Sequence, residues 1–239
     1  MKTRVHVAGL GVISAIGTSV ELNFSALRNS SSGISQLTLF DSIHKGILPV
    51  GEIKLSSSDL ADVLSLPQDL TRTALLGIHA ARESVKNSGI DITKWRTGLI
   101  SATTVGGMDK TEDFFGEFVD DHSKGKLHNV VNHQCGKSTE LIARDLGIKG
   151  FISTINTACS SSANAIALGS RMIDQGLLDI VVAGGTDSLT RFTLNGFNSL
   201  MILDTHHKQR VIFKALLYKA IVLALVFKFA VHPFVTLLL

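Results

Sequence analysis

The chain has 239 residues, of which 45% are hydrophobic and 18% charged, and it contains only three prolines. This composition is typical of a globular α/β protein that is long enough to form a substantial core. The formal net charge is +3, but all five basic residues beyond residue 204 lie in a tail without any acid, which leaves −2 for residues 1–204. The basicity therefore belongs to the tail and does not indicate nucleic-acid binding.

Hydrophobic periodicity predicts alternating strands and helices. In chain order we expect strand Val5–Gly9, a turn over Gly11–Gly17, helix Val20–Arg28, loop Ser30–Gly33, helix Asp69–Gly89, strand Leu99–Thr103, helix Met108–Val119, loop Asp120–Gly125, helix Thr139–Leu146, strand Phe151–Ile155, helix Ser160–Gln175 and strand Ile180–Ala183. Gly89 is expected to end its helix as a C′ residue. This alternation predicts a layered α/β architecture, in which helices cover a largely buried sheet.

The two cysteines, Cys135 and Cys159, are too few for a disulfide framework. Residues 1–7 lack the apolar stretch of a signal peptide. We therefore expect a cytoplasmic protein, because a reducing compartment keeps thiols free. Cys135 lacks a strand-to-helix setting like that of Cys159, and we interpret it as a buried or incidental thiol.

Cys159 lies where the predicted strand from Phe151 turns sharply into a helix rich in small residues. At a helix N-terminus, unpaired N–H groups and the macrodipole favour a thiolate. The thiolate is the form that attacks acyl carbonyls. A free cysteine is also commonly a small buried hydrophobe, and from Cys159 alone both interpretations stay open.

The neighbours of Cys159 resemble the β-ketoacyl-acyl-carrier-protein synthases, the thiolase-fold condensing enzymes of fatty acid and polyketide synthesis. Thr157-Ala158-Cys159-Ser160-Ser161 matches the nucleophile signature of that family. Four further stretches agree in the family's order, namely Val7–Gly17, Gly147–Gly150, Ala183–Asp187 and Asn195–Asp204. Five matches in the family's order across residues 3–204 make the resemblance to this family specific. The chain resembles the N-terminal half of an elongation-type synthase. The resemblance implies one half of a five-layered thiolase-like fold.

The resemblance also implies a mechanism, a two-stage Claisen condensation. An acyl group passes from the phosphopantetheine of acyl carrier protein to Cys159, and decarboxylating malonyl-carrier thioester then attacks it. No cofactor is bound, the partner is acyl carrier protein, and a homodimer or association with an intact synthase is expected. None of the nine histidines falls within the family motifs that drive decarboxylation. Only Cys159 is transferred as a catalytic residue, and we expect little or no turnover from this chain alone.

Two other functions stay open. One is a non-catalytic partner of an intact synthase, although the retained Cys159 argues against that role. The other is a thiolase-like coenzyme A acyltransferase on the same scaffold. The run from Thr157 to Ser161 and the later Gly184-Gly-Thr-Asp187 fit the carrier-protein branch better.

The resemblance stops at Asp204, which divides the chain into a synthase-like domain, 1–204, and an unrelated apolar, basic tail, 205–239. A reading-frame shift or a premature end in the gene is our hypothesis for the break. Ala220–Phe227 is continuously apolar, but Lys228 then interrupts the run, and a membrane span needs about 20 apolar residues. We expect a sticky helix or a disordered tail in place of a membrane anchor, and an exposed apolar surface that promotes association.

Several weaker motifs have simpler interpretations. Gly9-Leu-Gly11 lacks the third glycine of a dinucleotide fingerprint, and we expect a tight turn with close packing. His206-His207 do not share a face and have no ligand-bearing neighbours, so we expect no metal site. Surface or loop positions are expected for three further histidines, His122, His128 and His133. Core positions are expected for two aromatic residues, Phe192 and Phe197.

Overall fold

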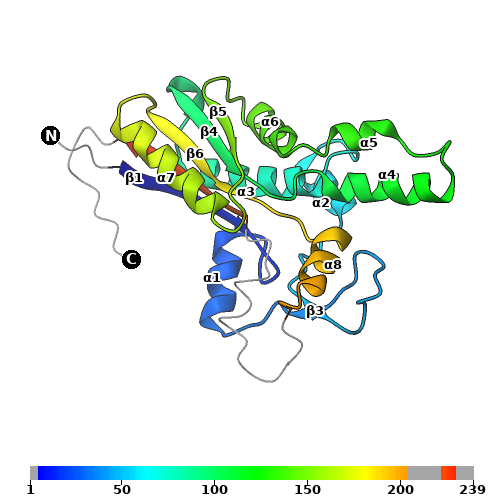
Figure 1. The fold of residues 1–239 in the computed structure, drawn as a ribbon. Helices are drawn as coiled ribbons and strands as arrows, with labels where there is room; N and C mark the ends of the chain where they lie inside the picture. Colours follow the sequence, from blue (N-terminus) through cyan, green and yellow to red (C-terminus); the bar gives the residue numbers. More distant parts are fainter. Residues whose placement is uncertain (1–4, 204–221, 230–239) are drawn as a thin grey trace.

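The computed structural model describes residues 5–203 and 222–229. Its centre is a five-stranded mixed sheet with the order β1-β7-β6-β4-β5 (Figure 1). The strands are β1 (Val5–Ile13), β4 (Thr97–Ala102), β5 (Ile152–Ile155), β6 (Ile180–Gly185) and β7 (Val222–Phe229). β4 is parallel to β5 and to β6, whereas β7 is antiparallel to both β1 and β6. Strands β1, β6, β4 and β5 therefore all run the same way and end at one edge of the sheet.

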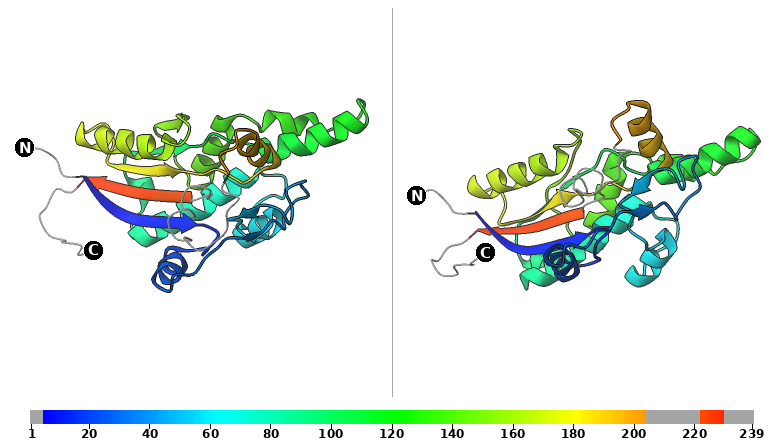
Figure 2. Two further views of the ribbon diagram at one scale, coloured as in Figure 1. Left: turned by 60° about the horizontal axis from the view of Figure 1, so that its bottom comes forward. Right: turned by 90° about the horizontal axis from the view of Figure 1, so that it is seen from below.

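Helices cover both faces of this sheet, as the sequence predicts (Figure 2). Alternate residues of β4 and β6 point to opposite faces because the side-chain period of a strand is two. Leu99 and Val182 pack with α3 (Arg72–Ser88) and α6 (Cys135–Asp145), while Ile100 and Val181 pack with α7 (Ser161–Asp174) on the other side. The central strands β4 and β6 are thus buried along their whole length between two helical layers.

β1 is longer than predicted, because it continues through Gly9 and Gly11 to Ile13 instead of turning at Gly11. Any side chain at Gly9 would collide with the backbone of α3 at Ser84, and one at Gly11 would collide with it at Ala80. The two glycines let strand and helix backbones approach closely. The expected close packing is confirmed, and the expected tight turn at these positions is wrong.

α3 is the longest helix of the described residues and carries the predicted apolar face. It begins at Arg72 instead of Asp69, because the Thr71 hydroxyl caps it by accepting a hydrogen bond from the backbone N–H of Ala74 at 3.3 Å. Gly89 ends it with a left-handed φ of 62°, as predicted. The predicted N-terminal boundary of α3 is wrong because the position of the capping residue, Thr71, sets where the helix begins.

The remaining elements lie around this three-layered core. They are α1 (Val20–Arg28), β2 (Ser35–Gln36), β3 (Pro49–Val50), α2 (Ser57–Leu64), a 3-10 turn (Ile92–Lys94), α4 (Met108–Asp120), α5 (Leu127–Val131) and α8 (Arg191–Ser199). α4 and α5 extend away from the sheet (Figure 1), and none of their side chains is buried. Exposed apolar residues, including Phe115, Leu127 and Val131, line this arm. Such a surface agrees with the expected association, which stays a prediction.

Part of the tail differs from the sequence expectation. Residues 222–229 form strand β7 between β1 and β6, so for this segment a helix or a disordered tail is wrong. Pairing on both edges satisfies backbone groups that an isolated apolar strand would leave open. Across residues 5–203 and 222–229, no helix combines the length and apolar character that crossing a bilayer requires. Residues 220 and 221 of the expected apolar run, and His206-His207, lie outside the described residues.

A buried carboxylate, Glu52, organises the loop that follows α1. Its side chain is 2% exposed and accepts hydrogen bonds from the Thr38 hydroxyl at 2.7 Å, the Leu39 N–H at 2.9 Å and the Lys54 ammonium. Burial raises the pKa of Glu52, but hydrogen bonds from Lys54, Leu39 and Thr38 outweigh it, so the pKa lies below the ordinary value of 4.5. The ionised form is therefore favoured by folding.

We expect Glu52→Gln to lower the free energy of unfolding at pH 7 by about 1–3 kcal/mol, since it removes a charged acceptor and leaves donors unpaired. The stabilisation by Glu52 is fully present above the unfolded pKa of 4.5 and is lost as pH falls through the lower folded value. Urea unfolding at pH 7 and at pH 3 measures both effects, with Glu21→Gln on the exposed side of α1 as the matched control. Equal acid sensitivity in wild type and Glu52→Gln would contradict this prediction.

Candidate functional site

Three connections meet at the carboxyl edge of the sheet, where its parallel strands end. They follow β4 (103–107), β5 (156–160) and β6 (186–190). In open α/β sheets, ligands bind outside this edge, because loops from several strands converge there. Cys159 lies in one of these connections and is exposed. This edge of the sheet is therefore the candidate functional site.

The turn that carries Cys159 has a special backbone. Ala158, immediately before it, adopts a left-handed φ of 53°, which is uncommon for a residue with a side chain. α7 begins at Ser161 and Ser160 is its N-cap, so Cys159 lies directly before the cap, one residue further from the helix than predicted. Non-glycine residues in this region cost on the order of 1–3 kcal/mol and persist only where the surroundings hold them.

Side-chain hydroxyls hold this turn from both sides. The Ser161 hydroxyl accepts a hydrogen bond from the Thr157 N–H at 2.8 Å and donates one to the Ala158 carbonyl at 2.7 Å. The Asn164 amide donates to the Thr157 hydroxyl at 2.8 Å, and the Ser160 hydroxyl donates to the Thr157 carbonyl, also at 2.8 Å. The sequence places these residues next to the nucleophile, but its pattern does not reveal that they fix the backbone. These hydrogen bonds hold the turn in this conformation.

A second polar hub, which sequence reasoning missed, lies in the neighbouring connections. Asp187, two residues after β6, accepts hydrogen bonds from the hydroxyls of Thr103 and Thr104 at 2.7 and 2.8 Å and from the N–H groups of Thr104 and Val105 at 2.8 and 3.1 Å. The Thr103 N–H also bonds the Ile155 carbonyl at 3.3 Å. Together these bonds join the ends of β4, β5 and β6. The available signal was an acidic residue two positions after a buried apolar strand.

Cys135 lies at the start of α6, which begins four residues before the predicted Thr139. This partly buried thiol accepts a long hydrogen bond from the Asn156 amide, with nitrogen and sulfur 3.7 Å apart. Burial raises the pKa of the Cys135 thiol, and the negative charge of Asp187 raises it further. Cys135 is therefore a poor nucleophile at neutral pH, while Cys159, three residues after Asn156, is open to solvent.

The predicted exposure of three histidines is confirmed, and the predicted burial of two phenylalanines is wrong. His122, His128 and His133 are exposed, as expected. Phe192 and Phe197, expected in the core, are 62% and 42% exposed. α8 buries Leu194 against Leu37, Leu48 and Val50, and its two phenylalanines lie outside that small cluster. Because no helix was predicted over residues 191–199, the sequence analysis did not separate the buried face of α8 from its exposed face.

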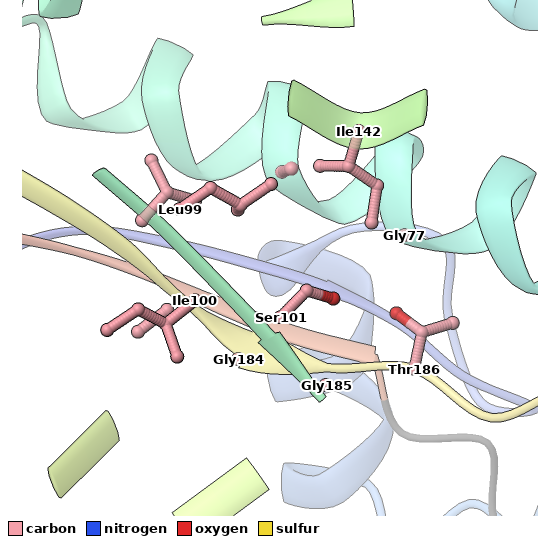
Figure 3. A pocket seen from close by; sticks show the side chains of 11 residues that line it. Gly77, Leu99, Ile100, Ser101, Ile142, Gly184, Gly185 and Thr186 are labelled. Carbon is pink, nitrogen blue, oxygen red and sulfur yellow. The ribbon is translucent and has the colours of Figure 1, made fainter. Parts of the chain in front are cut away.

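A cavity of about 20 Å³ lies between the sheet and the helices α3 and α6, lined among others by Gly77, Ser101, Ile142 and Thr186 (Figure 3). This volume has room for about one water molecule. Cys159 does not line it, so the cavity is a packing gap behind the sheet and not a substrate pocket. Within the described part of the chain, no three histidine, cysteine or acidic side chains gather as metal ligands would.

Comparison with known families agrees with this geometry. The model of the β-ketoacyl synthase N-terminal domain matches residues 2–215. The chain belongs to the β-ketoacyl synthase family. Ketosynthase structures share its fold, among them the ishigamide ketosynthase/chain length factor, with a TM-score of 0.80 and 24% identity over 96% of this chain and 59% of that one. A ketosynthase in complex with its chain length factor from Xenorhabdus doucetiae has a TM-score of 0.75 and 23% identity over 97% of this chain and 59% of that one.

Curated relatives carry a more specific name. The 3-oxoacyl-[acyl-carrier-protein] synthase 2 of Staphylococcus aureus (strain COL) is 27% identical over 209 residues, which cover 85% of this chain and 50% of that protein. The Vibrio harveyi protein of the same name is 28% identical over 219 residues, 87% of this chain and 51% of its own length. The chain therefore spans about half the length of the curated relatives it matches. The resemblance found from sequence motifs and the thiolase-like fold are both confirmed.

Proposed function

We propose that this β-ketoacyl synthase chain captures acyl groups on Cys159 from the phosphopantetheine thioester of acyl carrier protein. The Cys159 thiolate attacks the thioester carbonyl carbon, a new carbon–sulfur bond forms, and the bond to the phosphopantetheine sulfur breaks. The departing sulfur takes up a proton, so a thioester is exchanged for a thioester and no redox partner is needed. No bound cofactor takes part, and the expected setting is the cytoplasm.

The observation that carries this proposal is the exposed Cys159 on a preorganised turn at the carboxyl edge of the sheet. The addition step creates a negatively charged oxygen, which fixed N–H donors stabilise. In the family pattern the backbone N–H of Cys159 is one such donor, and the held conformation of Ala158 fixes the direction of that group. The raised pKa of Cys135 removes the other thiol as a competitor.

The second stage, decarboxylation of a malonyl thioester and attack on the acyl group, requires polarising groups that we do not assign to this chain. His44 pairs with Asn195 at 3.0 Å and His79 with the Thr18 carbonyl at 2.7 Å. We therefore expect residues 1–239 alone to form the thioester and to release little or no ketoacyl product. Catalytic groups that act as a unit lose nearly all their effect when part of the set is missing.

The decisive experiment incubates the purified chain with radiolabelled acyl-carrier protein and then with malonyl-carrier protein. We expect one acyl group per chain, mapped to Cys159 by peptide mass spectrometry, and no ketoacyl product. Absence of any acyl-protein would refute acyl capture, and robust ketoacyl product would refute the incapacity to condense.

Two variations of this experiment separate the alternative functions. Faster labelling from acyl-coenzyme A than from acyl-carrier protein would favour a thiolase-like acyltransferase. Binding of an intact synthase without acylation of Cys159 would favour a non-catalytic partner. One solved relative is a ketosynthase in complex with a chain length factor, so a partner subunit is a realistic competing role. The exposed Cys159 favours the catalytic one.

A further inference from the structure

We propose that Ser161 is a positioning residue that holds Cys159 in its reactive orientation by locking the left-handed backbone at Ala158. This inference rests on the proposed acyl capture at Cys159. The nucleophile signature contains Ser161, but a role for its side chain emerges only from the contacts of the turn.

The geometry of Ser161 is that of a two-ended clamp. Ser161 is 4% exposed, so its hydroxyl has little access to water. A hydroxyl can donate one hydrogen bond while it accepts others. It accepts from the Thr157 N–H at 2.8 Å and donates to the Ala158 carbonyl at 2.7 Å. The bonds therefore grip the backbone on both sides of the Ala158 α-carbon.

The other hydrogen bonds of the turn do not duplicate this grip. The side chains of Asn164 and Ser160 reach only Thr157, on the upstream side. The Ala158 carbonyl also accepts from the Ser161 backbone N–H at 3.1 Å, and the Thr157 carbonyl accepts from the Ser160 backbone N–H at 3.4 Å, so each of these backbone bonds holds one side of Ala158 only. Only the Ser161 hydroxyl, among the side chains of these residues, bonds backbone groups on both sides of Ala158, the Thr157 N–H and the Ala158 carbonyl.

The clamp matters because Ala158 has a side chain. With a φ of 53°, it occupies a region that glycine visits freely and alanine does not. Without the hydroxyl, Ala158 is expected to relax toward more favourable backbone angles and to carry the sulfur and N–H of Cys159 away from their held positions. A misplacement of about 1 Å is enough to cost on the order of a hundredfold in rate.

The test compares Ser161→Ala with Ser170→Ala, a serine of the same helix whose side chain makes no hydrogen bond within residues 5–203 and 222–229. Iodoacetamide alkylation is followed at each cysteine by mass spectrometry over a pH series, with Cys135 as the internal reference. We expect Ser161→Ala to slow both alkylation and acyl transfer at Cys159 by about tenfold to a hundredfold. Cys135 and the Ser170→Ala variant are expected to stay within twofold of wild type.

A second substitution separates positioning from general damage. Glycine adopts positive φ without strain, so Ala158→Gly combined with Ser161→Ala is expected to restore most of the lost reactivity at Cys159. A merely structural Ser161 would slow or accelerate both cysteines together and would not be rescued by glycine. Unchanged Cys159 kinetics in Ser161→Ala, or failure of the rescue in a folded double variant, would overturn the inference. If wild type is alkylated but never acylated, the proposed function fails, while the positioning result stands separately.

Discussion

Replacing Cys159 by serine is expected to abolish acyl transfer to the chain, with a loss of about a thousandfold or more, whereas Cys135→Ser leaves the rate within twofold of wild type. A serine hydroxyl lacks the acidity of a thiol and needs a general base to become nucleophilic. Within the described residues no basic side chain hydrogen-bonds the Cys159 sulfur, which is exposed on the turn that follows Ala158. Incubation with acyl-carrier protein followed by intact-mass spectrometry measures the effect directly.

Cys135→Ser is the control for Cys159→Ser in this experiment. Cys135 is partly buried and its raised pKa, caused by burial and by Asp187, keeps it protonated at neutral pH. The same serine substitution at Cys135 removes a thiol of comparable size without touching the turn at Ala158. Loss of labelling in Cys135→Ser with retention in Cys159→Ser would reverse the assignment of the nucleophile.

Local sequence signals predicted the features that depend on a few neighbouring residues. The helix Val20–Arg28 has the predicted bounds, because the Ser19 side chain caps its N-terminus. Gly89 ends α3 with the left-handed geometry that glycine favours. Cys159 lies between a strand and a helix, as expected. Each of these features is set by residues within one or two turns along the chain.

Features set by distant contacts were predicted less well. The sequence pattern of β1 does not reveal that Gly9 lies against Ser84 and Gly11 against Ala80 of α3, contacts between distant parts of the chain. The hub at Asp187 joins three strand ends that are separated by long stretches of chain. The clamp at Ser161 is local, but it depends on the unusual φ of Ala158, which no residue type announces. The candidate nucleophile was therefore predictable, and the groups that orient it were not.

The largest departure from expectation is the position of β7 in the sheet. Within the described residues, β1 joins the sheet only through β7, because the strand order places β7 between β1 and β6. β7 pairs with β1 from Val222 to Phe229 and with β6 from Leu223 to Lys228. Buried backbone groups left unpaired are costly, so this tail segment completes the sheet of the synthase-like domain.

A proline in the middle of β7 should therefore disrupt the fold, while a proline at its start should not. Val226 is paired with Gly9 on one side and with Val182 on the other, and Val226→Pro removes a ladder donor and imposes its own φ in a central strand. We expect Val226→Pro to lower the free energy of unfolding by about 1–3 kcal/mol, because it leaves a ladder carbonyl without its donor, and to speed amide hydrogen exchange in β1 and β6. Val222→Pro is the matched control, since the first residue of a strand tolerates proline. If the two variants unfold at the same urea concentration and exchange alike, residues 222–229 do not form the central strand.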